Sequence, residues 1–396
     1  MKKILILSHS MEIGGAERAL IGLLNALDTE KYRVDLFLMR HGGALMGEIP
    51  RSVKLLPEIK EYTCLAVPAS QVFKKGCFGV ALGRFVGKMK ARRYVVCHGM
   101  KVGEGVYLQY SHKYVRSFMP MISEEEYDLV ISFLTPHYFG AEKVRAKKRV
   151  AWIHTDYSRL EVDAVSERQM WDAYDKIVSI SDSVGAAFVE TFGGLEDKLL
   201  RVDNIISPDA VRASAEAESV RVGNEGETVL LSCGRVTEGK NFANIPRMCA
   251  SLLKKGHNVK WFIVGDGPDT GNVRESIERE GMTDRVILLG ARANPYPYMA
   301  ACDLYVQPSL YEGKAVAVRE AQILGRPVVI TDFPTASSQL TDGFDGLIAP
   351  LDTEKCAEFI SELLKTPEKM AELSENCKKT DYSNNSEAEK LLFLIN

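Results

Sequence analysis

Two short apolar runs constrain the fold more than any other feature of this 396-residue sequence. Lys3–Leu7 and Thr228–Cys233 are each followed by a glycine-containing loop and then by a helix-forming stretch. A continuous apolar run of this length is typical of a strand that is buried on both faces of a parallel sheet. A strand, a glycine loop and a helix are the opening unit of a doubly wound α/β domain. The sequence therefore predicts two such domains.

The length also favours two domains, because a single core rarely serves a chain of this size. Residues 207–227 are small and polar, and they are predicted to link the two domains. We place the N-terminal domain at residues 1–205 and the C-terminal domain at residues 206–380. The last helix, within residues 381–396, is expected to pack back on the N-terminal domain.

Composition and charge exclude several classes of protein. The net charge is −3, which gives no indication of a nucleic-acid partner. No apolar run approaches the ~20 residues that a membrane-spanning helix requires, and Ile4–Leu7 reads as a strand rather than as a secretory signal. The eight cysteines form no C-x-x-C pair, which argues against zinc and for a reducing compartment. We therefore expect a cytoplasmic protein.

The stretch Ser309–Glu320 carries the most specific indication of a ligand. It follows a predicted buried strand, Leu304–Val306, and it leads into a predicted helix. The backbone N–H groups of Gly313, Lys314 and Ala315 would lie at the start of that helix, where anions bind. The stretch therefore predicts an anion site that is built from backbone amides.

Two glutamates in this stretch, Glu312 and Glu320, stand eight positions apart. At about 1.5 Å rise per residue, Glu320 would sit roughly 8 Å deeper than the first turn of the helix. That separation suits a nucleotide diphosphate, with its phosphates at the helix start and its ribose hydroxyls at Glu320. The alternative is a surface helix that carries two solvated acids.

Other candidate residues follow predicted strands, and ligands of parallel α/β sheets bind beyond the carboxyl ends of strands. Gly15 would let the backbone approach a ligand closely, or it belongs to a simple tight turn. His154 would touch a substrate, or it is a structural histidine. Arg235 and Lys240 would stabilise the growing charge of a departing diphosphate, or they are two exposed loop cations.

Residues 72–93 combine basic and large apolar side chains in one helix-length stretch, and residues 62–103 contain no acid. Such a combination is typical of an interfacial helix that binds anionic lipid. The alternative is a helix that packs on its own domain and solvates its basic face. Glycines at positions 76, 79, 83 and 87 weaken the helix prediction. The sequence leaves both interpretations open.

Several short motifs occur in a specific order along nearly the whole chain. They are Gly14-Gly15-Ala16-Glu17, His154, Gly234-Arg235 with Lys240, Gly265-Asp266-Gly267-Pro268, Glu312-Gly313 through Glu320-Ala321, Gly325-Arg326-Pro327-Val328-Val329, and Asp342-Gly343 with Gly346. In order and spacing they resemble the retaining GT-B glycosyltransferases of the GT4 type, common in bacterial surface-polysaccharide synthesis. The resemblance implies an α/β GT-B fold with two Rossmann-like, doubly wound domains that face a central cleft.

By position, the resemblance implies a catalytic set of His154, Arg235, Lys240 and Glu312. Arg235 and Lys240 would hold the diphosphate of the donor. Glu312 would lie at the sugar ring, and His154 would lie near the hydroxyls of the sugar.

The resemblance also implies a donor-binding set of six residues: Gly15, Arg292, Gly313, Lys314, Ala315 and Glu320. Glu320 would bind the ribose, and the backbone around Arg292 would face the base. The amides of residues 313–315 would bind the phosphate and the sugar. Gly15 would approach the phosphate on the acceptor side.

The implied reaction is retaining and metal-independent. It moves a hexose or an N-acetylhexosamine from a UDP-sugar to a glycan or an undecaprenyl-diphosphate-linked acceptor in bacterial polysaccharide synthesis, such as that of a capsule. No cofactor and no metal are implied, and the chain has no Asp-x-Asp motif. The protein would be cytoplasmic, and peripheral on the inner face of the plasma membrane if residues 72–93 bind lipid.

The sequence departs from the family pattern at two positions, and two alternative functions stay open. Lys314 stands where family members often carry an aromatic residue, and Asn204-Ile205 replaces a common Asn-Gly turn. The alternatives are a nucleotide-sugar epimerase of the same fold and a non-catalytic partner subunit of a glycosyltransferase.

Overall fold

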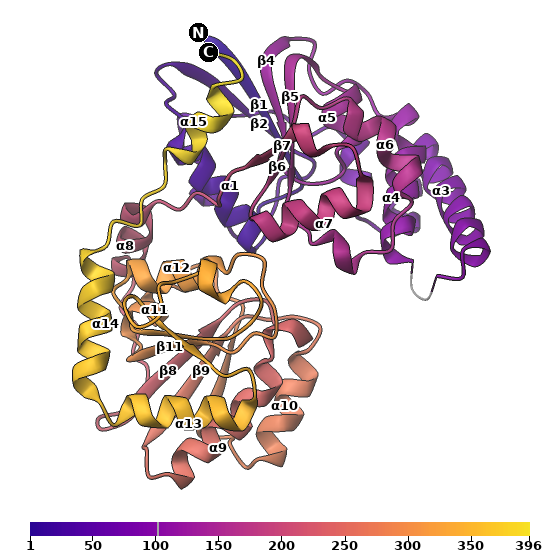
Figure 1. The fold of residues 1–396 in the computed structure, drawn as a ribbon. Helices are drawn as coiled ribbons and strands as arrows, with labels where there is room; N and C mark the ends of the chain where they lie inside the picture. The colour runs from indigo at the N-terminus through magenta and orange to yellow at the C-terminus, as the bar shows by residue number, and fades with distance from the viewer. Residues whose placement is uncertain (101–102) are drawn as a thin grey trace. The chain divides into compact units, whose positions relative to one another are not determined.

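In the computed structural model, which describes residues 1–100 and 103–396, the chain divides into two compact units (Figure 1). Unit 1 comprises Met1–Glu12, Ala19–Ile205 and Asn385–Asn396, and unit 2 comprises Ile13–Arg18 and Ile206–Asn384. Each unit contains one parallel sheet with helices on both of its faces. The predicted pair of doubly wound α/β domains is confirmed.

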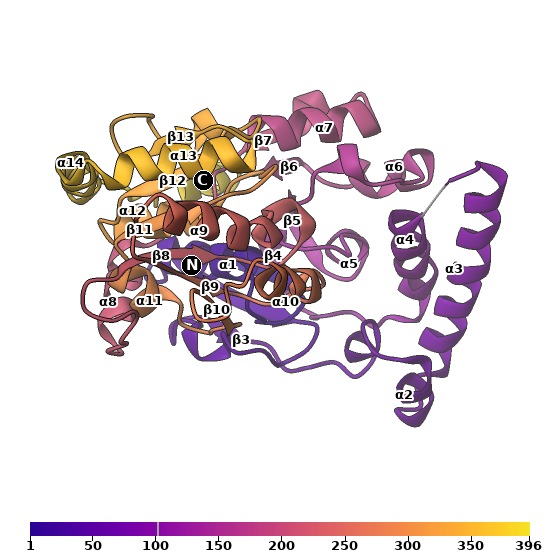
Figure 2. The same ribbon diagram turned by 90° about the horizontal axis from the view of Figure 1, so that it is seen from below.

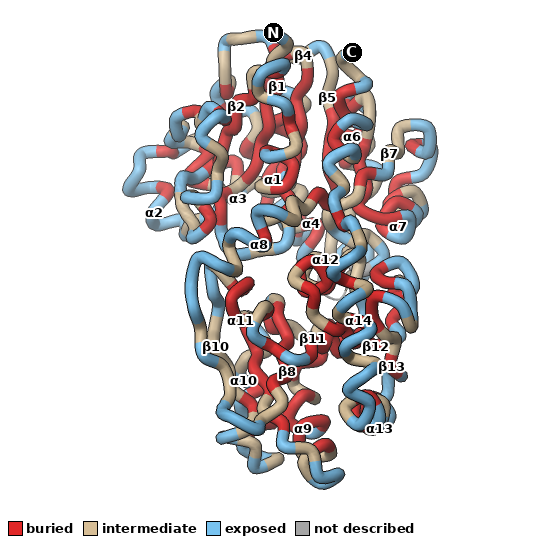
Figure 3. The backbone as a smooth tube through the Cα atoms, turned by 90° about the vertical axis from the view of Figure 1, so that its left-hand side faces the viewer, coloured by how far each residue is buried: buried red, intermediate tan, exposed pale blue. Residues whose placement is uncertain are grey.

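The sheet of unit 1 has seven strands in the order β3-β2-β1-β4-β5-β6-β7. The strands are β1 (Lys2–Ser8), β2 (Tyr32–Leu38), β3 (Lys54–Leu55), β4 (Glu126–Ser132), β5 (Arg145–Ile153), β6 (Lys176–Ser179) and β7 (Leu199–Arg201). β1 pairs with β2 in parallel from Lys2 opposite Tyr32 to Ser8 opposite Leu38. The central strands are buried, as the red segments of Figure 3 show, because helices cover both faces of the sheet.

The helices of unit 1 vary in length from one turn to more than five. They are α1 (Gly15–Ala26), α2 (Ala69–Lys74), α3 (Phe78–Cys97), α4 (Glu104–Val115), α5 (Tyr138–Glu142), α6 (Ala164–Asp172), α7 (Asp182–Phe192) and α15 (Glu387–Leu392). α1 begins within the segment that groups with unit 2 and continues in unit 1. α7 is capped at its start, since the Ser181 hydroxyl accepts a hydrogen bond from the Val184 amide at 3.3 Å.

Residues 72–93 form parts of two helices, α2 and α3, which Gly76 separates with a φ of +67°. Gly83 and Gly87 of α3 lie on its packing face against α4, and Gly79 lies against Phe118. A Cβ atom on Gly83 would lie 2.6 Å from the carbonyl oxygen of Tyr114, and one on Gly87 would lie 2.6 Å from that of Tyr110. α3 therefore lies directly against the outer side of α4 (Figure 2). Glycine weakens an isolated helix, but here it permits close helix packing.

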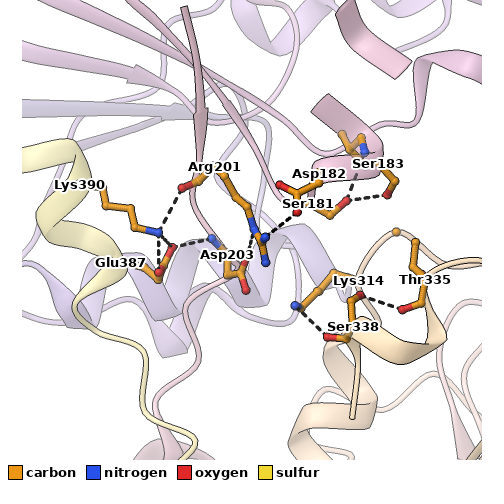
Figure 4. A network of polar contacts seen from close by, with 12 residues as sticks. Ser181, Asp182, Ser183, Arg201, Asp203, Lys314, Thr335, Ser338, Glu387 and Lys390 are labelled. Atoms are coloured by element: carbon orange, nitrogen blue, oxygen red, sulfur yellow. Dashed lines mark hydrogen bonds and ion pairs between the residues drawn. The ribbon is translucent and has the colours of Figure 1, made fainter. Parts of the chain in front are cut away.

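The end of the described chain returns to unit 1 through α15. The Tyr32 hydroxyl donates a hydrogen bond to Asn396 Oδ1 at 2.9 Å. The Asp203 amide donates to Glu387 Oε2 at 2.8 Å, and Figure 4 shows this contact beside the loop that follows β7. The returning segment begins at Asn385, whereas the sequence analysis placed it at residue 381.

The sheet of unit 2 has six strands in the order β10-β9-β8-β11-β12-β13. The strands are β8 (Thr228–Cys233), β9 (Val259–Val264), β10 (Val286–Gly290), β11 (Leu304–Gln307), β12 (Val328–Thr331) and β13 (Leu347–Ala349). The helices are α8 (Pro208–Glu216), α9 (Ile245–Lys254), α10 (Thr270–Arg279), α11 (Tyr296–Ala301), α12 (Val316–Ile323), α13 (Thr353–Leu364) and α14 (Pro367–Lys379). α9, α10 and α13 bury one face of the sheet, and α8, α11 and α12 bury the other.

The predicted linker at residues 207–227 is wrong in its first half, because Pro208–Glu216 form helix α8 of unit 2. The Ser207 hydroxyl accepts a hydrogen bond from the Ala210 amide at 3.3 Å and so caps this helix. Val211 is buried in the core that α8 shares with α11. Val211, the N-terminal cap and a hydrogen bond from Asn294 Nδ2 to the Ser214 carbonyl oxygen at 2.7 Å all hold this polar helix on the domain.

Candidate functional site

The strand order of unit 2 reverses between β8 and β11, because β9 and β10 lie on one side of this pair and β12 and β13 lie on the other. In parallel α/β sheets, ligands bind beyond the carboxyl ends of the strands at such a point. The loop after β8 carries Arg235 and Lys240, and the loop after β11 carries Glu312. The topology therefore brings these three predicted site residues to one edge of the sheet.

Glycines let the loops at this edge approach each other. The Leu310 amide donates a hydrogen bond to the Gly239 carbonyl oxygen at 2.8 Å. A Cβ atom on Gly239 would lie 2.5 Å from the ring of Tyr311. A Cβ atom on Gly265 would lie 1.8 Å from the carbonyl oxygen of Gly234, which no side chain could relieve. The close approach of these loops thus depends on contacts that only glycine allows.

Lys240 and Glu312 form an ion pair at this edge, with Lys240 Nζ 2.5 Å from Glu312 Oε1. The Ser309 hydroxyl donates to the same oxygen at 2.6 Å, and Gln307 Nε2 lies 3.3 Å from it. The side chain of Glu312 is 10% exposed and that of Lys240 is 21% exposed. Three donors on one oxygen fix the orientation of the carboxylate. Sequence reasoning did not identify Gln307 or Ser309 as its partners.

Glu320 lies in α12 with only 3% of its surface exposed. Its Oε1 atom accepts a hydrogen bond from the Tyr296 hydroxyl at 2.7 Å. Burial, together with the Glu320 carboxylate, raises the pKa of the Tyr296 phenol far above its usual range, so the phenol stays a donor. Sequence reasoning missed Tyr296, since no motif spacing connects the start of α11 with α12.

The loop that precedes α12 differs from expectation at one amide. The Ala315 N–H donates to Gln339 Oε1 at 2.9 Å, so this amide has an internal partner. Lys314 Nζ lies 3.3 Å from the Ser338 carbonyl oxygen, as Figure 4 shows. An anion at this helix start would have to displace the Gln339 side chain to reach Ala315. The phosphate-binding role of the Gly313–Ala315 amides stays a prediction.

Three predicted site residues lie in exposed or open positions. Arg235 and Arg292 are both exposed, and the Arg292 guanidinium lies 5.9 Å from the centre of the Tyr298 ring. No described atom lies within 4 Å of a Cβ atom built on Gly15. The fold itself therefore does not require glycine at position 15, and its predicted role at a ligand is untested.

His154 follows β5 directly, as the sequence predicted, and it belongs to unit 1. Its ring packs 4.7 Å from the ring of Phe133 and stacks at 5.9 Å on that of Trp152. Burial lowers the pKa of His154 to about 4. The imidazole is therefore neutral at physiological pH and can exchange hydrogen bonds with hydroxyl groups.

His154 also lines a cavity of about 100 Å³ in unit 1. The lining includes His112, His137 and Glu167, none of which the sequence analysis singled out. Burial lowers the pKa of both histidines to about 3 and raises the pKa of Glu167 to about 7. These residues come from α4, from the end of the β4 loop and from α6, so no sequence spacing groups them.

Within residues 1–100 and 103–396, no cluster of three or more His, Cys, Asp or Glu side chains is arranged to hold a metal ion. The same ranges contain no helix whose length and apolar character would let it cross a membrane.

Residues 215–380 match the family described as glycosyl transferases group 1. This range contains all the site residues from Arg235 to Glu320. The predicted class of enzyme, glycosyltransferase, is the class of the matched family. The matched range lies within unit 2.

Two curated relatives are glycosyltransferases as well. The alpha-D-kanosaminyltransferase of Streptomyces kanamyceticus is 28% identical over 159 residues, which is 39% of this chain and 41% of that protein. The N-acetylgalactosamine-N,N'-diacetylbacillosaminyl-diphospho-undecaprenol 4-alpha-N-acetylgalactosaminyltransferase of Campylobacter jejuni is 32% identical over 126 residues, which is 32% of this chain and 34% of that protein. The chain thus spans about two fifths or less of the length of these relatives.

Over its whole length the chain resembles a solved structure. The crystal structure of Anabaena Alr3699/HepE in complex with UDP and glucose matches with a TM-score of 0.67, 19% identity, and coverage of 99% of this chain and 98% of that chain. The shared architecture is the GT-B fold, so the predicted fold and the resemblance to GT-B glycosyltransferases are confirmed. The central cleft between the two domains stays a prediction.

Proposed function

We propose that this protein is a retaining, metal-independent glycosyltransferase. It moves a hexose or an N-acetylhexosamine from a UDP-sugar to a glycan or a lipid-linked acceptor in bacterial polysaccharide synthesis, in the cytoplasm. The observation that carries the proposal is the pairing of Lys240 with Glu312 at the switch point of unit 2, within the range that matches the group 1 glycosyl transferases. The Anabaena protein, crystallised with UDP and glucose, supports the donor class. The Campylobacter enzyme, whose name includes diphospho-undecaprenol, supports the acceptor class.

In this proposal the donor diphosphate lies against Arg235 and Lys240. The bond between C1 of the sugar and the β-phosphate oxygen breaks while C1 bonds to the acceptor hydroxyl oxygen on the same face. The proton of that hydroxyl passes to the departing phosphate oxygen. Two cations at this oxygen stabilise the charge that grows on it. Glu320 binds the ribose hydroxyls, and His154 binds hydroxyls of the transferred sugar.

The test is transfer activity, measured as UDP release over a panel of UDP-sugars with an acceptor present. Arg235→Ala, Lys240→Ala and Glu320→Gln should each lower transfer by roughly 100-fold, the effect of removing one group that stabilises transition-state charge or positions substrate. The control is Lys365→Ala, which removes a half-exposed cation from the end of α13. Full activity in all three site variants would refute the proposal.

The same assay separates the alternatives. Without an acceptor, an epimerase converts the free UDP-sugar to its isomer, whereas a transferase at most hydrolyses it slowly. A non-catalytic subunit does neither. The anomeric configuration of the product, read by nuclear magnetic resonance, tests retention, and unchanged activity after chelation tests metal independence.

We further propose that α2 and α3 contact an anionic membrane and so reach a lipid-linked acceptor. Large apolar side chains of α3 are exposed at helical spacing: Phe78 (66%), Leu82 (54%), Phe85 (61%) and Met89 (59%). The opposite face of α3 is buried against its own unit. So much apolar surface on one helix marks a contact site. The basic residues 88, 90, 92 and 93 of the same helix are exposed and would attract anionic lipid.

Flotation with vesicles tests the membrane contact. The protein should float with vesicles that contain phosphatidylglycerol and should stay at the bottom with vesicles of phosphatidylcholine alone. Phe78→Ser combined with Phe85→Ser should abolish flotation, because the change removes the apolar anchor. The control Phe393→Ser alters a side chain that is 82% exposed elsewhere in the unit, and it should float normally. Equal flotation with both kinds of vesicle would contradict an anionic surface.

A further inference from the structure

Arg18 lies in the first turn of α1, and it is the last residue of the segment Ile13–Arg18 that groups with unit 2. Its amide donates to the Gly14 carbonyl oxygen at 3.1 Å, as in a regular helix. Its side chain is half-buried and contacts residues that follow β10, far along the sequence. The proposed reaction gives this arginine no role, although its contacts lie beside the predicted donor site.

The guanidinium group of Arg18 makes two hydrogen bonds to different partners. Nη1 donates to the Tyr296 hydroxyl at 2.6 Å, and Nη2 donates to the Ala293 carbonyl oxygen. The guanidinium carbon also lies 4.6 Å from the centre of the Tyr296 ring, a distance at which a cation is attracted to an aromatic face. Because the donors of arginine form a rigid planar fork, these contacts fix Ala293 and Tyr296 relative to each other.

The chain of hydrogen bonds continues from Tyr296 to Glu320. The Tyr296 hydroxyl accepts from Arg18 and donates to Glu320 Oε1 at 2.7 Å. A hydroxyl has a single hydrogen, and arginine can only donate, so the contact with Arg18 directs that hydrogen to the carboxylate. Tyr296 is 7% exposed and Glu320 is 3% exposed. Hydrogen bonds that are shielded from water in this way are electrostatically stronger.

Arg18 also supplies positive charge beside a buried carboxylate. Burial raises the pKa of the Cys233 thiol to about 12 and the pKa of the Tyr305 phenol well above its usual range, so both are uncharged at neutral pH. Burial lowers the pKa of Arg18, but the charge of Glu320 and the contact with Tyr296 together outweigh burial and raise it. A buried carboxylate is costly unless a cation compensates it. Arg18 therefore favours an ionised Glu320, which can only accept hydrogen bonds.

We infer that Arg18 is a positioning residue for the nucleoside part of the donor. Through Tyr296 it orients Glu320 toward the ribose hydroxyls. Its second hydrogen bond fixes the Ala293 carbonyl oxygen, next to the backbone that is predicted to face the base. A carboxylate that uses one acceptor position for Tyr296 keeps others for two hydroxyl groups. The inference rests on the proposed function, which assigns the ribose to Glu320.

Calorimetry with UDP, uridine and inorganic diphosphate tests this role on the full chain. Arg18→Met removes the guanidinium and keeps a long side chain. It should weaken the binding of UDP and of uridine by the same factor, at least about tenfold, the effect of losing hydrogen bonds that involve a charged group. The binding of inorganic diphosphate should not change, because Arg235 and Lys240 are intact.

The kinetics of transfer give a second readout of the same variant. The KM for the UDP-sugar should rise by a factor similar to the loss of UDP affinity in Arg18→Met. The kcat should stay within about twofold of the parent's, because the nucleoside is held alike in the ground state and in the transition state.

Two further variants separate positioning from packing. Arg18→Lys keeps the charge, but an ammonium group cannot span both acceptors as the fork does. Its uridine affinity should therefore lie between those of the parent and of Arg18→Met. In a Tyr296→Phe background, Arg18→Met should cost less affinity than in the parent, because the link to Glu320 is already cut. The matched control Arg247→Met alters an arginine on α9 that is 56% exposed, and it should bind uridine normally.

Several results would overturn the inference. They are unchanged uridine binding by Arg18→Met, a loss of affinity that is confined to UDP, and equal losses from Arg18→Lys and Arg18→Met. If Arg18→Met does not fold, a uridine affinity of Arg18→Lys equal to the parent's overturns it instead. Glu320→Gln distinguishes this failure from that of the proposed function. Weaker UDP binding by Glu320→Gln, with full binding by Arg18→Met, would leave the proposed transferase intact and remove only Arg18 from its donor site.

Discussion

The buried carboxyl group of Glu167 should make the stability of the protein depend on pH. This carboxyl group lies on α6 and is 4% exposed, and burial raises its pKa from 4.5 to about 7. The hydrogen bond from Tyr138 and the charges of Lys113 and Arg116 act in the opposite direction but do not offset burial. Glu167→Gln removes the titration and keeps an oxygen that can accept from Tyr138.

The sign follows from the two pKa values. The folded state keeps the proton up to about pH 7, whereas the unfolded chain releases it near pH 4.5. The folded protein therefore loses stability as the pH rises from 4.5 to 7, and the loss is complete above pH 7. At about 1.4 kcal/mol for each pKa unit, the full loss is roughly 3 kcal/mol. The Glu167→Gln variant has no carboxyl group to ionise at this position, so its stability does not fall in this way.

The assay is urea unfolding at pH 5 and pH 8, in a Trp261→Phe background so that fluorescence reports on unit 1. The free energy of unfolding of Glu167→Gln minus that of the parent should be roughly 2–3 kcal/mol higher at pH 8 than at pH 5, which means that the variant gains stability relative to the parent as the pH rises. The buried histidines titrate in both proteins, so their effect cancels in this difference. The control Glu190→Gln, on the exposed side of α7, should show no such gain.

A difference between Glu167→Gln and its parent that stays constant with pH would refute the reasoning. It would mean that Glu167 is ionised in the folded protein near pH 5, and that the cavity around it is hydrated well enough to solvate a charge. A gain in the Glu190→Gln control as large as that of Glu167→Gln would equally refute it, because the effect would then come from net charge.

Three further predictions address packing and the donor site. Gly83→Ala should destabilise unit 1 by about 1–3 kcal/mol in urea unfolding, because its Cβ atom would meet the backbone of Tyr114; an unchanged midpoint would contradict the close packing of α3 on α4. Gly15→Ala should leave the melting temperature unchanged, since its Cβ atom meets no described atom, but should lower transfer if a ligand approaches there; unchanged transfer would remove Gly15 from the site. Tyr296→Phe should raise the KM for the UDP-sugar by roughly 10-fold, the effect of a lost hydrogen bond to a charged group, because Glu320 loses its donor; an unchanged KM would show that Tyr296 does not position it.

The sequence predicted the parts of the fold that rest on local patterns. Continuous apolar runs identified strands such as β8. The rule that ligands lie beyond strand ends placed Lys240 and Glu312 in one predicted site, and their side chains lie 2.5 Å apart in the structure. The same rule located His154 directly after β5. These predictions succeeded because a parallel strand is recognisable from its own residues and because its end is fixed once the strand is known.

The rest could not be predicted, for physical reasons that differ from case to case. Helix α8 was assigned to a linker because its composition is polar, although Ser207 and Pro208 are the residues that typically cap and begin a helix. Tyr296 and Gln339 reach Glu320 and Ala315 only through tertiary packing. No local pattern encodes such partners. Likewise, the glycines of α3 disfavour a helix by propensity and are explained only by the neighbouring helix.

The return of residues 385–396 to unit 1 has a consequence for how the protein is made. Unit 2 is continuous from Ile206 to Asn384, so most of it can leave the ribosome and fold while the chain is still growing. Unit 1 must wait for the last residues, because the Lys2 ammonium group donates to the Ile395 carbonyl oxygen and Tyr32 donates to Asn396. Since these contacts also hold residues 1 and 396 near each other (Figure 1), a short peptide could join these two residues in an engineered chain, and a new start could be opened between the units at residue 206. In such a permuted protein, the ribosome would make the two long segments of unit 1 one directly after the other. The synthesis of unit 2 would no longer separate them.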